Sequence, residues 1–302
     1  MKALVTGATG LVGRELVRRI GDAAVLTRDV EQSRRVLGAA VRCFAWRPEA
    51  EPAPAAAFEG VDVVFHLAGE PVASGRWTPE KKRRIRDSRV LGTRHLVAAL
   101  QGLRALPRVL VCASAVGFYG SRGSSELRED TPRGDGFLAD VVEAWEAEAR
   151  AAEPLGIRVV NARFGLVLAP AGGALARMLT PFRLGVGGRL GDGAQWMSWV
   201  HIDDVVGLLF HAAHDPRLRG PLNVVSPEPV TNAEFTRALG HALRRPAIFP
   251  VPLLALRALF GELADVLLHS QRALPAAALD TSYAFAYPRL GPALVACLKG
   301  AN

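Results

Sequence analysis

The chain begins with a strand-like run that leads directly into a glycine-rich turn. Residues 2–6 read Lys-Ala-Leu-Val-Thr, glycines follow at positions 7, 10 and 13, and residues 11–20 carry a helical pattern. Gly7 permits a tight strand-to-helix turn, Gly10 lets the backbone approach a ligand, and Gly13 lets the helix pack closely. The helix N-terminus offers free N–H groups and a positive dipole end. This order is what the pyrophosphate of a bound dinucleotide requires.

The spacing of these glycines is G-x-x-G-x-x-G rather than the G-x-G-x-x-G of the simpler fingerprint. The alternative interpretation is a glycine-rich turn without a ligand. The position between a strand and a helix favours the cofactor interpretation. We therefore predict that the turn and the first helical turn contact the cofactor through Gly7, Thr9, Gly10, Leu11, Val12 and Gly13.

Strand-like apolar runs then alternate with helical patterns as far as residue 170. This alternation predicts an α/β fold, a doubly wound parallel sheet of the Rossmann type with helices on both faces. The expected strands are residues 3–6, 24–27, 41–46, 61–67, 109–113 and part of 157–168, and the expected helices are 11–20, 79–100 and 138–152.

The rhythm changes beyond residue 170, where glycines mark turns and a flexible loop. We predict a core at residues 1–170, to which residues 199–226 return, and a small C-terminal α/β substrate lobe within 171–302. In this part we expect strands at 199–202 and 222–225, a helix at 203–214 capped by Asp203 or Asp204, a helix to 243 opened by the capping box Thr231-Asn232-Ala233-Glu234, and an amphipathic helix at 253–268.

Composition limits the class of protein. Half of the 302 residues are hydrophobic and 22% are charged, as in ordinary globular proteins, and no run reaches the roughly 18 apolar residues of a membrane span. The N-terminus shows no leader pattern, and Cys43, Cys112 and Cys297 suit neither a disulfide framework nor a zinc site. We expect a cytoplasmic protein without a metal, with Cys112 as a small core residue.

The net charge of +8 raises the question of an acidic partner. The densest basic cluster, residues 76–89, has the pattern of a solvated helix face and lacks the interleaved aromatic residues that stack on bases. We expect a small-molecule substrate and a possible homodimer, with neither nucleic acid nor membrane as a partner. Arg183 and Arg189 either meet an anionic substrate or are simply solvated.

The end of the second predicted strand bears on the choice of coenzyme. A carboxylate about 20 residues beyond the glycine turn would hold the ribose 2′-hydroxyl of NAD, but Thr27 and Arg28 stand there. A guanidinium can stack on adenine and pair with a 2′-phosphate. NADP(H) is therefore favoured over NAD(H), although the neighbouring Asp29 keeps NAD as an alternative, and Arg28 could be only a surface residue.

Two further strand ends supply candidate residues, because the carboxyl ends of parallel strands line the ligand crevice. Leu67, Ala68 and Gly69 leave room for a cofactor, whereas the preceding His66 has the setting of a core histidine. Ser114 could hydrogen-bond a substrate carbonyl or hydroxyl, or it could only satisfy the backbone of its turn.

Four motifs together resemble an extended or atypical short-chain dehydrogenase/reductase. More narrowly, the chain resembles the epimerase-family proteins of the SDR39U1-like or YfcH-like kind, within the NAD-dependent epimerase/dehydratase superfamily. The motifs are the glycine turn, Leu67-Ala68-Gly69, Ser114 with Phe118-Tyr119-Gly120, and the stretch 199–204, and the resemblance covers nearly the whole chain. It implies a Rossmann core, NADP(H) binding and a C-terminal substrate lobe, with cofactor contacts from Thr27, Arg28, Leu67, Ala68 and Arg89.

The chain departs from that superfamily at its usual proton-transfer pair, Tyr-x-x-x-Lys. Counting back from Glu146, Leu138 and Val142 stand near the two positions. Tyr119 is the nearest phenol to Ser114 in sequence and is the remaining candidate acid. Two functions stay open: an NADP-dependent oxidoreductase or epimerase of unusual mechanism using Ser114 and Tyr119, or an NADP(H)-binding redox sensor or partner-binding protein with little turnover.

Overall fold

A seven-stranded parallel sheet organises the chain. The computed structural model describes residues 1–170 and 172–299. The strand order is β11-β7-β5-β4-β1-β2-β3, and every neighbouring pair is parallel. The order runs outward in opposite directions from β1 and β4, so the crevice that binds ligands in such sheets lies at their carboxyl ends. The strands are β1 Ala3–Thr6, β2 Ala23–Thr27, β3 Arg42–Ala45, β4 Val63–His66, β5 Val109–Ala115, β7 Arg158–Phe164 and β11 Gly220–Val224.

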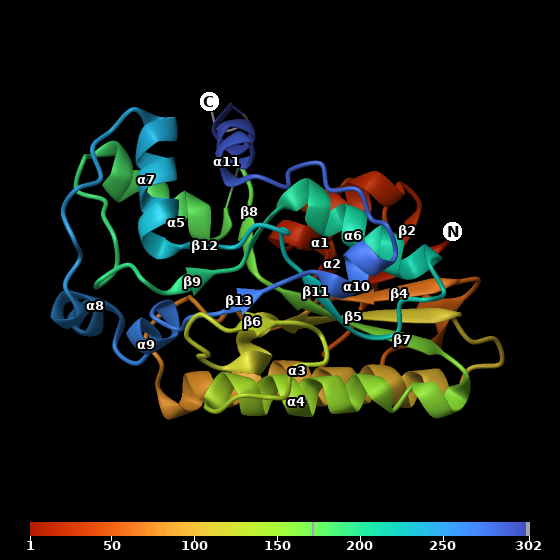
Figure 1. The fold of residues 1–302 in the computed structure, drawn as a ribbon. Coiled ribbons are helices and arrows are strands. Elements are labelled where there is room, and N and C mark those ends of the chain that lie inside the picture. The colour runs from red at the N-terminus through yellow and green to blue at the C-terminus, as the bar shows by residue number, and fades with distance from the viewer. Residues whose placement is uncertain (171, 300–302) are drawn as a thin grey trace.

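Helices cover both faces of this sheet (Figure 1). One apolar cluster joins the sheet to α1 and α6, and a second joins it to α3 and α4. This confirms the α/β doubly wound fold expected from the sequence. The covering helices are α1 Leu11–Ile20, α2 Val30–Leu37, α6 Ile202–His214 and α10 Ala276–Asp280 on one side, and α3 Pro79–Gln101 and α4 Phe137–Arg150 on the other.

The C-terminal lobe has a core of its own, in which Trp199 and Phe235 are fully buried. Its helices are α5 Gly173–Arg183, α7 Asn232–Leu243, α8 Leu253–Phe260, α9 Leu263–Leu267 and α11 Leu290–Lys299. Three two-stranded pairs complete the structure: β8 Leu166–Leu168 with β10 Trp199–His201, β9 Trp196–Met197 with β12 Val230–Thr231, and β6 Glu126–Leu127 with β13 Arg272–Ala273. Short 3-10 turns lie at Ala55–Phe58, Val116–Tyr119 and Glu153–Leu155.

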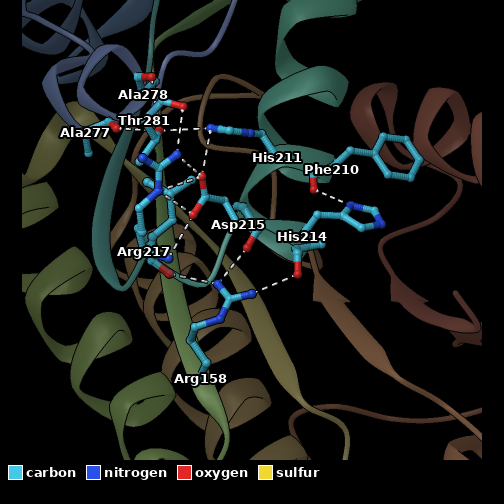
Figure 2. Close-up of polar contacts among 12 residues, drawn as sticks. Arg158, Phe210, His211, His214, Asp215, Arg217, Ala277, Ala278 and Thr281 are labelled. Atoms are coloured by element: carbon cyan, nitrogen blue, oxygen red, sulfur yellow. Dashed lines mark hydrogen bonds and ion pairs between the residues drawn. The ribbon is translucent and has the colours of Figure 1, made fainter.

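The end of α6 is tied to both β7 and α10 by a polar cluster (Figure 2). The guanidinium of Arg158 donates to the carbonyl oxygens of Ala212 and Ala213 at 2.7 and 2.8 Å, which satisfies backbone groups that a helix end leaves free. His211 Nε2 lies 2.9 Å from the hydroxyl of Thr281, the residue that follows α10. His211 therefore takes part in packing, and the described residues contain no group of three or more His, Cys, Asp or Glu side chains arranged to hold a metal.

The predicted capping box of α7 is confirmed, and the helix predicted at 203–214 is found as α6, but its predicted cap is wrong. Thr231 and Glu234 form the expected reciprocal capping box. The cap of α6 is His201, whose Nδ1 accepts from the Asp203 amide, and neither aspartate caps this helix. Asp203 pairs instead with Arg19, and Asp204 accepts two backbone amides from the C-terminal segment.

The single amphipathic helix predicted at 253–268 is also wrong. Gly261, with φ of 59°, ends α8, and α9 starts two residues later. A left-handed residue cannot continue an α-helix, so the apolar pattern runs through two short helices. Within the described residues, no helix combines the length and apolar character that crossing a membrane requires.

Candidate functional site

The glycine turn between β1 and α1 is shaped by close backbone approach. Gly7 has φ of 67°, and a Cβ there would lie 2.7 Å from the carbonyl carbon of Leu67. A Cβ at Gly13 would collide with the Gly7 carbonyl oxygen, and that oxygen accepts from the Gly10 amide at 3.0 Å. There is therefore no space for a side chain at Gly7 or Gly13. The first-turn amides of α1, at Leu11 and Val12, have no partner within the helix and are available to an anion.

The end of β4 is held against this turn by a chain of hydrogen bonds. The Thr6 hydroxyl accepts from the amides of Leu67 and Ala68, both at 3.1 Å, and lies 2.8 Å from His66 Nδ1. Because the Thr6 oxygen accepts both of these hydrogen bonds, the Thr6 hydroxyl donates its own proton to His66 Nδ1. The proton of the neutral ring is then on Nε2, which donates to the Thr93 hydroxyl at 3.1 Å. Burial lowers the pKa of His66 to about 4, so the ring is neutral. His66 is the satisfied core histidine that the sequence predicts.

A cavity of about 240 Å³ opens where the turn meets the ends of β2, β3 and β4. The structure brings together there most of the residues predicted to contact a cofactor. These are Gly7, Thr9, Gly10, Thr27, Arg28, Leu67, Ala68 and Gly69.

Four predicted residues do not line the cavity. Leu11 and Val12 pack their side chains against the apolar cluster that joins the sheet to α1 and α6, and Gly13 contacts the backbone of Gly7 and Ala8 within the turn. Arg89 lies next to the cavity: its guanidinium carbon would be 3.2 Å from a Cβ at Gly69, and it sits 5.1 Å from the ring centroid of Trp145. Burial lowers the pKa of Arg89 to about 10, which leaves the side chain cationic at neutral pH.

The end of β2 carries the residues on which the sequence-based choice between the two coenzymes rests. Arg28 is exposed on the rim of the cavity. Asp29, the residue that kept NAD open, caps α2, because its Oδ1 accepts from the Gln32 amide at 2.9 Å. The Thr27 hydroxyl accepts from Ser33 at 2.7 Å. The Asp29 carboxylate is therefore engaged with a helix, and Arg28 places a guanidinium at this rim, where the exposed carboxylate of Glu49 also lies.

Other residues of the cavity were missed from the sequence. Glu70 forms an ion pair with Lys81 at 2.6 Å, and this hydrogen bond lowers the pKa of Glu70. The loops after β3 and β4 could have been included, because every carboxyl end of a parallel strand near the reversal of strand order faces the crevice. The missed residues include Ala8, Ser33, Trp46, Pro48, Glu49, Glu70, Pro71 and Ser88.

A larger hollow of about 600 Å³ lies elsewhere, lined by Leu11, Arg14, Leu37, Val41 and Ile202 among others. It follows the outer sides of α1 and α2, and its described lining residues include no carboxyl end of the seven-stranded sheet. The glycine turn and the strand ends face the smaller cavity, so we assign the dinucleotide to the smaller one.

Ser114, at the end of β5, belongs to a buried polar network. Its hydroxyl donates to Glu146 of α4 at 2.6 Å, and Arg163 of β7 donates to both oxygens of that carboxylate at 2.7 and 2.8 Å. All three side chains are almost fully buried. The ion pair satisfies two charges that could not otherwise be buried, and it fixes the direction of the serine hydrogen bond.

Tyr119 lies in the same network, away from solvent. Its hydroxyl donates to Asn223 Oδ1 at 2.7 Å and lies 2.9 Å from Arg163. Burial raises the pKa of Tyr119 to about 12. The catalytic assignments of Ser114 and Tyr119 stay predictions, and the network through Glu146 and Arg163 was not foreseen.

The positions near which the sequence places the missing Tyr-x-x-x-Lys pair are apolar in the structure. The Leu138 side chain lies beside Gly117, 3.5 Å from where a Cβ of that glycine would be, and Val142 is buried. Neither side chain can exchange a proton, so chemistry at this site would require other groups.

Two family models match the chain. The model described as the NAD dependent epimerase/dehydratase family matches residues 3–225, and one described as a domain of unknown function, DUF1731, matches residues 251–297. The first match covers the glycine turn and every strand of the central sheet.

Individual proteins also match this chain over almost its full length. Epimerase family protein Mb2239 of Mycobacterium bovis is 41% identical over 293 residues, covering 96% of this chain and 95% of that protein. The crystal structure of human epimerase family protein SDR39U1 with NADPH is 33% identical, has a TM-score of 0.88 and is covered to 99%, as is this chain. The UDP-glucose 4-epimerase of Thermus thermophilus in complex with NAD is 22% identical with a TM-score of 0.79 and full coverage of both chains, which shows a shared fold.

Proposed function

Because the chain belongs to the NAD dependent epimerase/dehydratase family, we propose that it is an NADP(H)-dependent oxidoreductase or epimerase-like enzyme acting on a small carbonyl or hydroxyl substrate. The observation that carries this proposal is the cavity formed by the glycine turn, the end of β4 and the exposed Arg28. A coenzyme bound there would supply or accept the hydride, and the protein would position the substrate and manage the proton.

The choice of NADP(H) over NAD(H) rests on the rim of the cavity. Arg28 can pair with a 2′-phosphate, whereas the carboxylate of Asp29 is already bonded to α2. The NADPH in the human SDR39U1 structure supports this choice. In this arrangement the first-turn amides of α1 hold the pyrophosphate, and Ala68 and Gly69 leave space beside it.

The buried network determines whether the Ser114 hydroxyl can donate or accept a hydrogen bond at the site. Its proton is committed to Glu146, so the oxygen is left to accept. We therefore assign Ser114 to a substrate hydroxyl rather than to a carbonyl, which has no proton to give. Tyr119 is the weaker candidate for proton transfer, because its hydroxyl already donates to Asn223 and burial raises its pKa.

A second function has support of its own. A redox sensor or partner-binding protein needs the coenzyme but no proton donor, and Leu138 and Val142 provide none at the superfamily's usual position. The retained Ser114 network and the complete lobe favour an enzyme.

Coenzyme binding tests the first part of the proposal. Arg28→Ala should weaken NADPH binding by about tenfold or more and remove the preference over NADH, because a charge-assisted contact to phosphate is lost. Titration calorimetry with both coenzymes measures this. Arg104→Ala is the matched control, since Arg104 is an exposed arginine between α3 and β5, near the amino end of β5 and away from the carboxyl ends that line the cavity. Equal affinities of the parent protein for the two coenzymes would refute the assignment.

Turnover separates the two functions. A screen of small carbonyl and hydroxyl compounds, followed by NADPH absorbance, should find activity that Ser114→Ala lowers and that Ser125→Ala, at an exposed serine, leaves unchanged. Tight NADPH binding without turnover on any compound would favour the sensor. Activity unaffected by Ser114→Ala would remove this serine from the mechanism.

A further inference from the structure

Large apolar side chains are exposed together on two segments of the C-terminal lobe. Leu254 is 81% exposed, Ile248 74% and Leu184 73%, whereas side chains of this kind are normally buried. More than half of the exposed large apolar residues among the described positions lie here. We call this group the outer patch: Leu184, Val186, Ile248, Phe249, Leu253 and Leu254.

The two segments form one continuous surface. Leu190 and Val251 form a parallel β-bridge, in which the Gly191 amide donates to the Val251 carbonyl at 3.0 Å and the Val251 amide donates to the Arg189 carbonyl at 2.8 Å. Gly188 lies so close to the Phe249 carbonyl that it has no space for a side chain. The two segments run side by side along the outer edge of the lobe, between α7 and α8 (Figure 1).

The outer patch is bordered by cations. Arg183, Arg189, Arg244 and Arg245 are exposed, and the ion pairs found among the described residues involve none of the four. The one acidic residue in the stretches 183–193 and 244–257 is Asp192, whose carboxylate accepts from the Ala194 amide. The surface is therefore both apolar and strongly positive.

These features together indicate which kind of partner binds the outer patch. The apolar side chains line neither of the two cavities described above. A second copy docking through the same patch would bring its arginines against these arginines, which repel. Apolar side chains surrounded by arginine are what a protein needs to sit in the headgroup region of an anionic bilayer.

We propose that the outer patch binds the surface of membranes that contain anionic phospholipid. Ile248, Phe249 and Leu254 enter the boundary between headgroups and acyl chains, and the four arginines pair with lipid phosphates. The sequence-based expectation of no membrane partner rested on the absence of a spanning run, which bears on crossing a bilayer and not on binding its surface. The proposal does not depend on the proposed coenzyme or on turnover.

Sedimentation of the full chain with vesicles tests this proposal. The protein should bind vesicles of phosphatidylcholine containing about a third phosphatidylglycerol, bind pure phosphatidylcholine vesicles weakly, and dissociate as salt is raised. Arg244→Gln with Arg245→Gln should weaken binding about thirtyfold, which corresponds to about 1 kcal/mol for each cation. Arg83→Gln with Arg86→Gln, two exposed arginines of α3, should leave binding unchanged.

The apolar contribution is tested in the same assay. Ile248→Ser with Phe249→Ser should weaken binding at least tenfold, whereas Leu279→Ser, at a residue half-exposed on α10, should not. All substituted residues are exposed, so unchanged circular dichroism is expected. The proposal is overturned if the parent protein does not bind the anionic vesicles, if the α3 and α10 controls weaken binding equally, or if analytical ultracentrifugation shows a dimer that Ile248→Ser with Phe249→Ser dissociates.

Discussion

Single residues decide the shape of the candidate site, and His66 is the clearest case. It lies at the end of β4 with hydrogen bonds to Thr6 and Thr93 on its two ring nitrogens. Thr6 in turn holds the amides of Leu67 and Ala68 beside the cavity. The ring must stay neutral, because a protonated Nδ1 would oppose the proton that Thr6 directs to it.

This requirement makes stability depend on pH. The folded-state pKa of His66, about 4, lies below the ordinary value of 6.5, so the unfolded chain takes up the proton first as pH falls. The contribution of His66 is complete above pH 6.5 and decreases toward pH 4, with a loss of roughly 2 kcal/mol by about pH 5. Urea unfolding across this range should show a smaller loss in His66→Gln than in the parent. His214→Gln, at an exposed histidine, should keep the parent's slope.

The buried Glu146–Arg163 ion pair leads to a second prediction about single residues, which concerns the free energy of unfolding. Arg163→Met leaves a carboxylate buried without its cation, and we expect a loss of about 3–5 kcal/mol in the free energy of unfolding. Arg94→Met removes the ion pair between Arg94 of α3 and Glu148 of α4. This pair lies at the surface, so its loss should cost less than about 1 kcal/mol. Denaturant unfolding compares the two, and similar small losses would contradict a network of buried charges.

The sequence showed part of this site for a physical reason. The glycine turn, the end of β2 and the end of β4 are local patterns, so their residues could be chosen by inspection. The network around Ser114 joins positions far apart in the chain: Tyr119 and Asn223 are 104 residues apart, and Ser114 and Glu146 are 32 apart. These residues become partners only through the order in which the strands pair, and that order cannot be read from a single sequence.

At the scale of elements, Asp204 shows how a helix can hold a distant segment. It stands in the first turn of α6 and is almost fully buried. Its two carboxylate oxygens accept from the amides of Ala286 and Tyr287 at 2.7 and 2.9 Å. The residue predicted as a possible cap therefore fixes the chain that leads into α11.

Asp204→Asn should loosen this segment. The amide group can accept only one of the two backbone protons and turns a donor toward the other, at a cost of about 1–3 kcal/mol. Hydrogen exchange should increase at residues 283–299 more than in the central strands. Asp203→Asn is the matched control because Asp203 is more exposed. Equal protection of this segment in parent and Asp204→Asn proteins would show that other contacts hold it.

The elements found from the sequence are those with long regular patterns. The apolar strands β1, β4 and β5 and the helices α1, α3 and α4 were located within a few residues. α2 was missed because its eight residues are mostly polar, and α11 because Gly291 and Pro292 stand in its first turn and suggest a loop. The break at Gly261 was missed because apolar residues continue on both sides of it.

At the scale of the whole molecule, the lobe is attached to one side of the cavity to which we assign the coenzyme. The segment that follows β4 is held by Lys82 to Glu262, by Arg76 to the Ala258 carbonyl and by Arg177 to the Ala73 carbonyl. The same segment begins with Gly69 and Glu70, which line the cavity. Binding of the coenzyme should therefore stabilise more than the sheet to which it attaches.

Unfolding measurements check this expectation. NADP⁺ at about 100 times its dissociation constant should raise the free energy of unfolding by about 2.7 kcal/mol, since only the folded protein binds it. Gly13→Ala should abolish the increase, because its methyl group displaces the turn. Gly102→Ala, where an added Cβ has ordinary contacts, should retain it. No increase in the parent would indicate that the cavity does not accept the coenzyme.

The pairing of β6 with β13 limits how this chain can be divided. Residues 272–273 lie beside 126–127, Ser270 bonds to Ser121, and Asn223 bonds to the Leu274 carbonyl. The stretch matched by the second family model is therefore bonded to residues within the stretch that the first family model matches. It is not a portable module, so a chimera that takes residues 251–297 from a relative would have to take residues 121–129 with them.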